Sequence, residues 1–307
     1  MLTTLATLAG LALAQQTDTT VPVRAGARLE VNNFGGEIAV KVWSKSAVRI
    51  TASHSSRDRI IVDASEQVVR VKSEGRRGPS QVVDYDITVP AAMALALSGV
   101  YTDISVEGSE GEITAETVQG AVKVSGGSGN VSLKSVQGDV TLEKARGRID
   151  LSSVNETIKA TQITGDISAE TVNGDISLAQ IESGNTEATT VNGDVMYDGT
   201  IKDGGRYRFS THDGDLRVSI PEKSSVSVSV STFNGDFSAC FPVQLIGKTK
   251  HRFNFTIGSG SARLELESFD GDIRLCRPGQ LAKDKDWRAK NNDWDKNKDH
   301  DNDQEEE

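Results

Sequence analysis

A nine-residue repeat between Thr102 and Leu178 constrains the fold of this chain more than any other feature. Counted from Thr102 in steps of nine, seven of the nine register positions hold glycine. The residues two and four places after each register position are apolar in all eighteen cases, and mostly polar residues separate them. Internal periodicity of this regularity predicts a repeat protein.

Each unit of the repeat predicts one short strand and one corner. Apolar residues at alternate positions place two side chains on the same face of a strand. Glycine at the register position suits a sharp turn, because a positive φ is unfavourable for any residue with a Cβ. The predicted corner glycines include Gly138, Gly165, Gly174 and, where the spacing loosens, Gly193.

A second period of eighteen residues lies over the first. Valine recurs every eighteen residues, two places before the register position, at Val100, Val118, Val136, Val154 and Val172. Units of this size cannot bury their own apolar face, so they must stack on one another. We therefore predict a parallel β-solenoid of eighteen-residue coils, each with two nine-residue strand units. Equivalent strands of successive coils should lie about 4.8 Å apart along the axis. The alternative is an antiparallel β-meander, since a period of nine also fits hairpins.

Composition and charge narrow the class of protein. The chain has 307 residues, 29 of them glycine, and 36% are hydrophobic, which is typical of a β-solenoid. A net charge of −10 argues against binding to nucleic acid, which requires a basic surface. No run of apolar residues is long enough to form a transmembrane helix.

The chain divides into four predicted segments. Residues 1–14 are apolar and end in an Ala-x-Ala pattern, which predicts a signal peptide and an exported, periplasmic or cell-surface protein. Residues 21–90 are predicted to form a β-rich N-terminal cap, and residues 91–277 the solenoid repeats. Residues 281–307 hold ten acidic and six basic residues and are predicted to be a disordered tail. Near the end of the repeats Phe233 and Phe269 replace the recurring valine, which suggests a larger core there.

Amide side chains form a second recurring feature. Asn155, Asn173 and Asn192 precede successive corners, and Asn234 does so further along the chain. Stacked coils would bring such residues above one another, where side-chain amides can form a hydrogen-bonded ladder. Asn-Gly is also a favoured turn dipeptide. Both interpretations are structural, and a ligand-binding stripe of amides is the alternative.

The residues do not indicate a metal site or a catalytic centre. Aspartate follows glycine directly at Asp175, Asp194, Asp215, Asp236 and Asp272. Calcium-binding nonapeptide rolls instead separate the two residues by one position. Corner capping is the expected role for these carboxylates. The four histidines are scattered and have no motif around them. We therefore expect no metal, no cofactor and no catalytic residues.

Two cysteines occupy equivalent positions in the repeat. Cys240 and Cys276 each follow a corner glycine by five residues. Equivalent positions on adjacent coils lie about 4.8 Å apart, within the Cα range of a disulfide. Their separation of 36 residues corresponds to two coils, so the pairing requires residues 241–268 to form an enlarged coil or an excursion. On that condition we predict a disulfide; two reduced, buried cysteines are the alternative.

Several motifs resemble a known family. They are the stretch from Leu29 to Trp43 (LEVNNFGGEIAVKVW), the repeated Thr-Val-Asn-Gly-Asp-Ile blocks, Asp84–Pro90 (DYDITVP) and Ser268–Leu275 (SFDGDIRL). They resemble the bacterial putative adhesin family with β-strand repeats, a domain of unknown function, over roughly residues 21–277. The resemblance implies an exported, envelope-associated solenoid and carries over no functional residues.

The function expected from these features is a non-enzymatic adhesion or interaction scaffold. Its expected partner is an envelope protein or a glycan. Two alternatives stay open, namely a polysaccharide-binding or polysaccharide-processing β-helix and a structural element that self-associates end to end.

Overall fold

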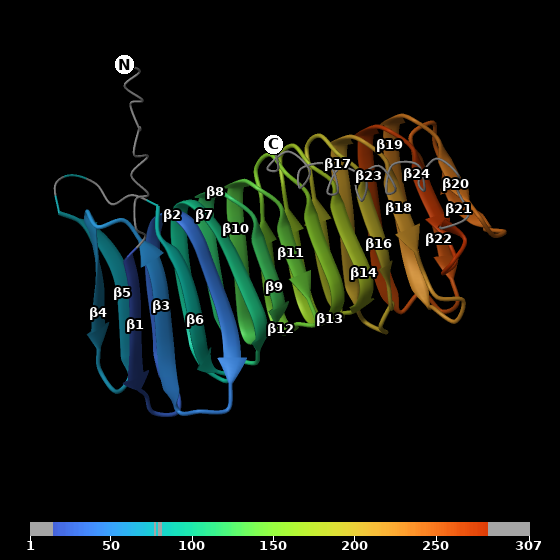
Figure 1. Cartoon of the computed structure of the whole chain (residues 1–307). Helices are drawn as coiled ribbons and strands as arrows, with labels where there is room; N and C mark the ends of the chain where they lie inside the picture. The colour runs from blue at the N-terminus through green and yellow to red at the C-terminus, as the bar shows by residue number, and fades with distance from the viewer. Residues whose placement is uncertain (1–14, 77, 79–81, 282–307) are drawn as a thin grey trace, which may run out of the picture.

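The fold is an elongated, all-β solenoid (Figure 1). The computed structural model describes residues 15–76, 78 and 82–281; residues 1–14 and 282–307, which include the predicted signal peptide and nearly all of the predicted tail, lie outside the described residues. The described residues form 24 strands and no α-helix, and they include no helix that is long and apolar enough to cross a membrane. All eighteen apolar repeat positions point inward and are at most 3% exposed.

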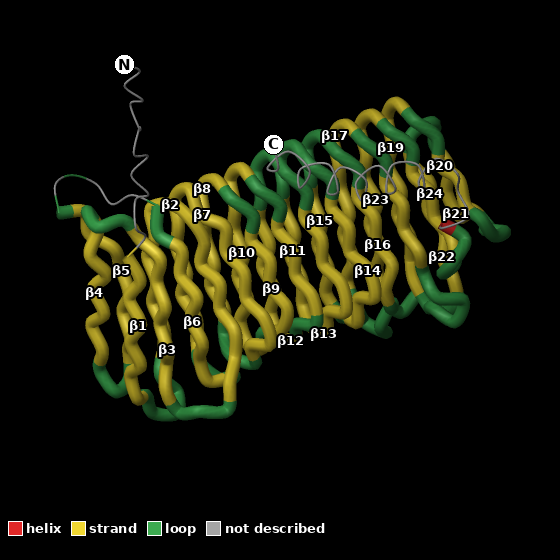
Figure 2. The backbone as a smooth tube through the Cα atoms, viewed as in Figure 1, coloured by secondary structure: helices red, strands yellow, loops and turns green. Residues whose placement is uncertain are grey.

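The strands form two walls that enclose the core, with loops along the edges between them (Figure 2). Hydrogen-bonded neighbours in the first wall run in the order β4 (Asp58–Ala64), β5 (Val68–Gly75), the first half of β2 (Arg28–Trp43), the first half of β7 (Ala94–Ser109), β8 (Ile113–Gln119), β10 (Ser128–Gln137), β12 (Arg146–Ser152), the second half of β13 (Ile158–Glu170), β15 (Asn185–Thr189), β17 (Arg206–Asp213), β23 (Ala262–Asp270), β19 (Val226–Asn234), β22 (Arg252–Ile257) and β21 (Leu245–Lys248).

The second wall runs beside the first for the whole length of the solenoid. Its order is β1 (Gln15–Pro22), β3 (Ala47–His54), β6 (Asp84–Pro90), the second half of β2, the second half of β7, β9 (Val122–Gly126), β11 (Val140–Glu143), the first half of β13, β14 (Ile176–Glu182), β16 (Val195–Gly199), β18 (Leu216–Ser219), β24 (Ile273–Cys276) and β20 (Phe237–Ala239).

The register within the repeats has the predicted period of eighteen. Val122 pairs with Val140, Val140 with Ile158, and Ile158 with Ile176, all in parallel strands. Parallel pairing places the same repeat position of successive coils side by side, which buries both apolar positions of every unit. The prediction of a parallel β-solenoid is therefore confirmed, and the repeats do not form the alternative antiparallel meander.

Antiparallel strands cover both ends of the parallel stack. β1 pairs with β3 and β4 with β5 at one end, while β22 pairs with β19 and β21 with β22 at the other. β2, from the segment 21–90, pairs in parallel with β7 of the repeats along both of its halves. An open coil would expose unpaired strand edges and apolar core, and these antiparallel strands limit that exposure.

The last coil of the chain does not lie at the end of the solenoid. β23 pairs on one side with β17 and on the other with β19, although β19 precedes it in the sequence. β24 lies in the same way between β18 and β20. The chain therefore skips one level, forms the coil β19–β20 and the hairpin β21–β22, and then returns to fill the gap. Figure 1 shows the red last strands within the orange end of the molecule.

This topology brings the two cysteines onto neighbouring coils. A disulfide joins Cys240, which follows β20, to Cys276 at the end of β24, with 4.8 Å between the two Cα atoms. The segment between them contains the β21–β22 hairpin, which is an excursion from the stack. Cys276 is buried and Cys240 is exposed.

The core is bulkier towards the end that holds the last coil, but not because of the phenylalanines that the sequence suggested. Buried aromatic side chains supply the bulk, namely Tyr197, Tyr207, Phe209 and Phe255. Phe233 and Phe269 are instead 54% and 46% exposed. The expectation that these two residues enlarge the core was wrong. They follow an inward-pointing Thr232 and Ser268, and strand alternation therefore turns them outward.

Candidate functional site

One edge of the solenoid carries the recurring Thr-Val-Asn-Gly-Asp corner, and stacking converts each motif position into a column along the axis. We call this surface the Asn-Gly-Asp edge. Its corners lie in the spatial order Gly120, Gly138, Glu156, Gly174, Gly193, Gly214, Gly271 and Gly235. The role of each column can be determined from its contacts.

The glycine column is required by close approach between coils. A Cβ at Gly138 would overlap the carbonyl oxygen of Gly120, and one at Gly193 would overlap that of Gly174. Gly174 meets the carbonyl of Glu156 in the same way. At the opposite edge, a Cβ at Gly165 would overlap the carbonyl oxygen of Gly147. Gly165 also has a φ of 129°, which a residue with a Cβ rarely adopts. The predicted corner glycines thus lie at corners, and contact with the preceding coil is a stronger reason for glycine than the turn alone.

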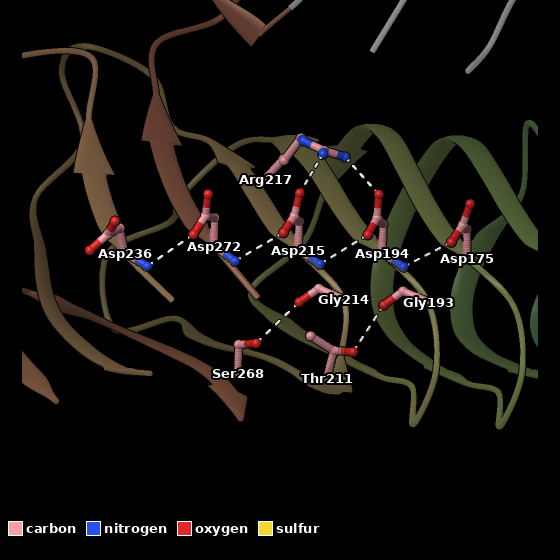
Figure 3. Close-up of polar contacts among 10 residues, drawn as sticks. All are labelled: Asp175, Gly193, Asp194, Thr211, Gly214, Asp215, Arg217, Asp236, Ser268 and Asp272. Carbon is pink, nitrogen blue, oxygen red and sulfur yellow. Dashed lines mark hydrogen bonds and ion pairs between the residues drawn. The ribbon is translucent and has the colours of Figure 1, made fainter. Parts of the chain in front are cut away.

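The aspartate column satisfies the backbone N–H groups at the corner (Figure 3). The Oδ1 atom of Asp175 accepts a hydrogen bond from the N–H of Asp194 at 2.8 Å, and Oδ1 of Asp194 accepts one from Asp215 at 2.9 Å. The chain of bonds continues through Asp272 to Asp236, each at 2.9 Å. These carboxylates therefore cap corners, and no group of three or more His, Cys, Asp or Glu in the described part of the chain is arranged to hold a metal ion.

One arginine bridges two members of the aspartate column. Arg217 donates to Asp194 at 2.8 Å and to Asp215 at 2.7 Å, as Figure 3 shows. Its side chain is only 16% exposed, so solvent screens these ion pairs less than a surface pair. The pairing reduces the repulsion between stacked carboxylates that lie one strand spacing apart.

The hydroxyl column satisfies the corner carbonyl groups. Thr211 donates from Oγ1 to the carbonyl of Gly193 at 2.9 Å, and Ser268 donates from Oγ to that of Gly214 at 3.1 Å. The same bond recurs from Ser135 to Gly120 at 2.9 Å. The aspartate column accepts hydrogen bonds from the N–H groups of the corner, and the hydroxyl column donates hydrogen bonds to its carbonyl groups. Without these partners the backbone groups would lose their hydrogen bonds on burial.

The amide column forms a ladder over three coils. Nδ2 of Asn173 donates to Oδ1 of Asn155 at 3.0 Å, and Nδ2 of Asn192 donates to Oδ1 of Asn173 at 2.7 Å. Asn234 is not part of this ladder. Asp213 and Asp270 lie between it and Asn192 in the stack, because the last coil is inserted there.

The remaining motif position, the recurring valine, makes no comparable contribution to the interior. Eight large apolar side chains at this position are between 36% and 54% exposed: Phe34, Val100, Val118, Val136, Val172, Val191, Phe269 and Phe233. We call them, with the half-buried Val154 and the exposed His212, the apolar column. It is continuous along the Asn-Gly-Asp edge, beside the amides and the carboxylates.

Sequence reasoning identified these valines but not their exposure. The signal lay in the strand before each corner, where Ile113, Ala115 and Thr117 alternate and all point inward. The next residue, Val118, must therefore point outward. The corner itself breaks the alternation of inward and outward side chains. The strand after the corner therefore cannot be used to predict the direction of Val118.

Two putative adhesins and a putative cell adhesion protein are among the solved structures that are similar to this chain. A search of curated proteins found no match. Among solved structures, a putative adhesin from Bacteroides fragilis is 12% identical and covers 87% of this chain and 100% of its own, with a TM-score of 0.43. A putative adhesin from Parabacteroides distasonis is 9% identical, covers 86% of this chain and 98% of its own, and has a TM-score of 0.42. A putative cell adhesion protein from Clostridium sporogenes is 11% identical, covers 86% of this chain and 100% of its own, and has a TM-score of 0.24.

The family comparison concerns the part of the chain that contains the most regular Asn-Gly-Asp corners. Residues 169–276 match the model of a family described as Toastrack DUF4097. This segment includes the inserted last coil and both cysteines. Over residues 169–276 the chain is thus similar to the Toastrack DUF4097 family, in keeping with the adhesin-like domain of unknown function that its sequence resembles.

Proposed function

We propose that this protein is an exported, non-enzymatic interaction scaffold that binds its partner along the Asn-Gly-Asp edge. One observation carries the proposal, namely the exposed apolar column. Every other position of the corner motif has an intramolecular role, in steric fit, in hydrogen bonding or in the amide ladder. Contiguous exposed apolar side chains rimmed by polar residues are typical of interaction surfaces.

The rigidity of the edge supports this function. Backbone and side-chain hydrogen bonds connect each corner to the next through the aspartate, hydroxyl and amide columns. The apolar side chains, most of them valine, have few rotamers to lose. Binding to a surface that is already ordered costs less conformational entropy, which favours affinity.

The disulfide supports the exported part of the proposal. Disulfides persist in oxidising compartments such as the periplasm and the cell surface, and they are rare in the cytosol. The predicted signal peptide, at residues 1–14, points to the same location. Fractionation of cells that express an epitope-tagged chain tests it, and recovery in the cytoplasm would contradict export.

The state of the titratable groups supports binding rather than catalysis. The edge carboxylates of Asp175, Asp194 and Asp215 accept structural hydrogen bonds. Burial raises the pKa of Tyr85 to about 12 and also raises the pKa of Tyr197, so both phenols stay protonated at neutral pH. A general acid or base needs a pKa near the working pH and access to a substrate, and the two buried phenols lack both.

The proposal is tested by removing the apolar column without changing charge. The variant Val118→Ser/Val136→Ser/Val172→Ser should lose retention of envelope proteins or glycans on immobilised protein. The matched control, Thr141→Ala/Ser177→Ala, changes outward side chains of β11 and β14 away from the column and should retain binding. Equal retention by all three proteins would contradict the proposal.

Two further measurements separate the alternatives. Release of reducing sugars from a bound polysaccharide would indicate the processing enzyme instead. Filaments in negative-stain images would indicate the self-associating structural element. Antiparallel strands at both ends of the stack do not favour that element, since copies could not continue the parallel coils in register.

A further inference from the structure

The apolar column changes character where the last coil is inserted, and it becomes a stack of four aromatic rings. The rings follow the spatial order His212, Phe269, Phe233 and His251. Their centroids lie 4.8, 5.1 and 4.8 Å apart, and the interplanar angles are 14°, 4° and 16°. We call these four residues the ring stack. Its two phenyl rings are both exposed, Phe233 by 54% and Phe269 by 46%.

The ring stack is held in place by the backbone. His251 closes it from the loop between β21 and β22, where its Nδ1 lies 3.2 Å from the carbonyl oxygen of Thr232. The N–H of Thr232 donates in turn to the carbonyl oxygen of His251 at 3.0 Å. The other three rings stand on strands β17, β23 and β19, which pair in fixed register. The exposed rings are therefore an ordered surface and not a mobile one.

A groove of about 510 Å³ lies against the ring stack. All four rings line it, together with the hydroxyl groups of Ser210 and Ser231 and the charged side chains of Arg252 and Glu267. Most of the lining is polar, and the rings of Phe233 and Phe269 are its large apolar surfaces. A large apolar side chain of a ligand can pack on these two rings while the hydroxyls pair with polar groups of the same ligand.

Carboxylates flank the ring stack on its other side. The amide column is replaced here by Asp213 and Asp270, which are direct Cα partners and are both exposed. Asp236 and Asp272 of the aspartate column are also exposed beside them. Stacked like charges raise the local negative potential, and a cationic partner would relieve their repulsion.

Charge decides between the possible occupants of this surface. A second copy carries the same −10 net charge and the same carboxylates, so self-association through the ring stack would oppose like charges. Residues 281–307 of the chain itself, with ten acidic and six basic residues, are also acidic. A partner that suits this surface must be cationic and must carry apolar groups next to its charges, because the rings and the carboxylates occupy adjacent columns.

We propose that the ring stack and its flanking carboxylates bind a peptide segment of a partner protein in which lysine or arginine neighbours large apolar residues. The apolar side chains enter the groove beside Phe233 and Phe269. The cationic groups pair with Asp213 and Asp270. This inference rests on the proposed function and specifies where on the edge the partner binds and what chemistry it has.

The test uses the full chain and a short fluorescent peptide in which lysine alternates with leucine, followed by fluorescence anisotropy. Two comparison peptides replace leucine with serine or lysine with glutamate. The lysine–leucine peptide should bind most tightly and should weaken as salt is added, since charge pairs at the surface are screened. Equal binding of the glutamate–leucine peptide would overturn the proposal.

Variants locate the site. Phe233→Ser/Phe269→Ser should weaken binding at least about tenfold, as expected for aromatic residues at the centre of an interface. Asp213→Asn/Asp270→Asn should weaken it several-fold and make it less sensitive to salt. The control Ile246→Ser removes an apolar side chain that is 75% exposed but lies on β21, away from the ring stack, and it should bind like the unmodified protein. Thermal melting checks that each variant is folded.

Other occupants give different results. A doubling of mass in sedimentation that Phe233→Ser/Phe269→Ser abolishes would assign the surface to a second copy and overturn the proposal. Binding of an amino-sugar oligomer, with the same dependence on the two phenylalanines and with no binding of the peptide, would assign it to a glycan and also overturn it. If no peptide binds while the Val118→Ser/Val136→Ser/Val172→Ser variant still loses envelope material, only the partner class is wrong and the proposed function stands.

Discussion

Removal of the Cys240–Cys276 disulfide should loosen one end of the solenoid and leave the rest intact. The bond closes a segment of 36 residues that contains the β21–β22 hairpin and the inserted coil β23–β24. In the chain-entropy model, a loop of that size stabilises the folded state by about 4 kcal/mol at 25 °C. We expect the inserted coil to depend on this bond more than the others do, because the bond joins the end of its last strand, β24, to the residue that follows β20 on the neighbouring coil.

The loss should be local because solenoids are stabilised by contacts between neighbouring coils. In the variant Cys240→Ala/Cys276→Ala, the amides of β19 and β23 should exchange hydrogen faster by up to about a thousandfold, which corresponds to about 4 kcal/mol. Amides of β8, β10 and β12, several coils away, should keep their protection. Alanine is chosen because Cys276 is buried and a serine hydroxyl there would add a desolvation cost.

Hydrogen exchange measured by mass spectrometry checks this prediction, with the reduced unmodified protein as the control that changes no side chain. Reduced protein and the alanine variant should show the same local loss of protection. Unchanged protection of β19 and β23 in both samples would refute the reasoning. So would the recovery of both thiols free in protein purified from the periplasm.

Three further changes test the fold. Gly165→Ala should destabilise the protein by more than about 1 kcal/mol, because the new Cβ would overlap the carbonyl of the preceding coil at a φ of 129°. The control Gly184→Ala places a Cβ where no atom lies within 4 Å, so it should be neutral or slightly stabilising, and thermal melts compare the two variants. Ile167→Asp should abolish folding of the repeats, since it loses roughly 1.5–3 kcal/mol of burial and adds a buried charge. Asp175→Ala should cost about 1 kcal/mol of stability, because one hydrogen bond is lost. Comparable denaturation midpoints for the two variants would contradict the assignment of inward and outward faces. Burial raises the pKa of Tyr85 from 10 to about 12, so the contribution of this phenol to folding stability is fully present below pH 10 and is lost as the pH rises to 12. Tyr85→Phe should therefore flatten the fall in stability between pH 10 and pH 12, measured by denaturation.

The sequence alone was sufficient to predict the class of fold and the faces of the repeats. A strict period of eighteen can be satisfied by one register only, because a shift of a single residue would turn every inward side chain to the solvent. Ile113, Val131, Ile149 and Ile167 are therefore buried neighbours on successive coils. The positions of the corner glycines followed from the same period, since a repeated close approach of backbones requires the same residue in each coil.

The ring stack depends on tertiary structure. The outward direction of the valines follows from the alternation in the preceding strand, but stacking of the coils is what joins these side chains into one continuous apolar column. The order of the rings cannot be read along the chain at all. Phe269 separates His212 from Phe233 only because the last coil, 57 residues after its neighbour in the stack, returns to fill the level that the chain had skipped. A local period determines how adjacent coils pack, but it does not specify which strands far apart in the sequence pair, as β17 and β23 do, and that pairing sets the order of the coils.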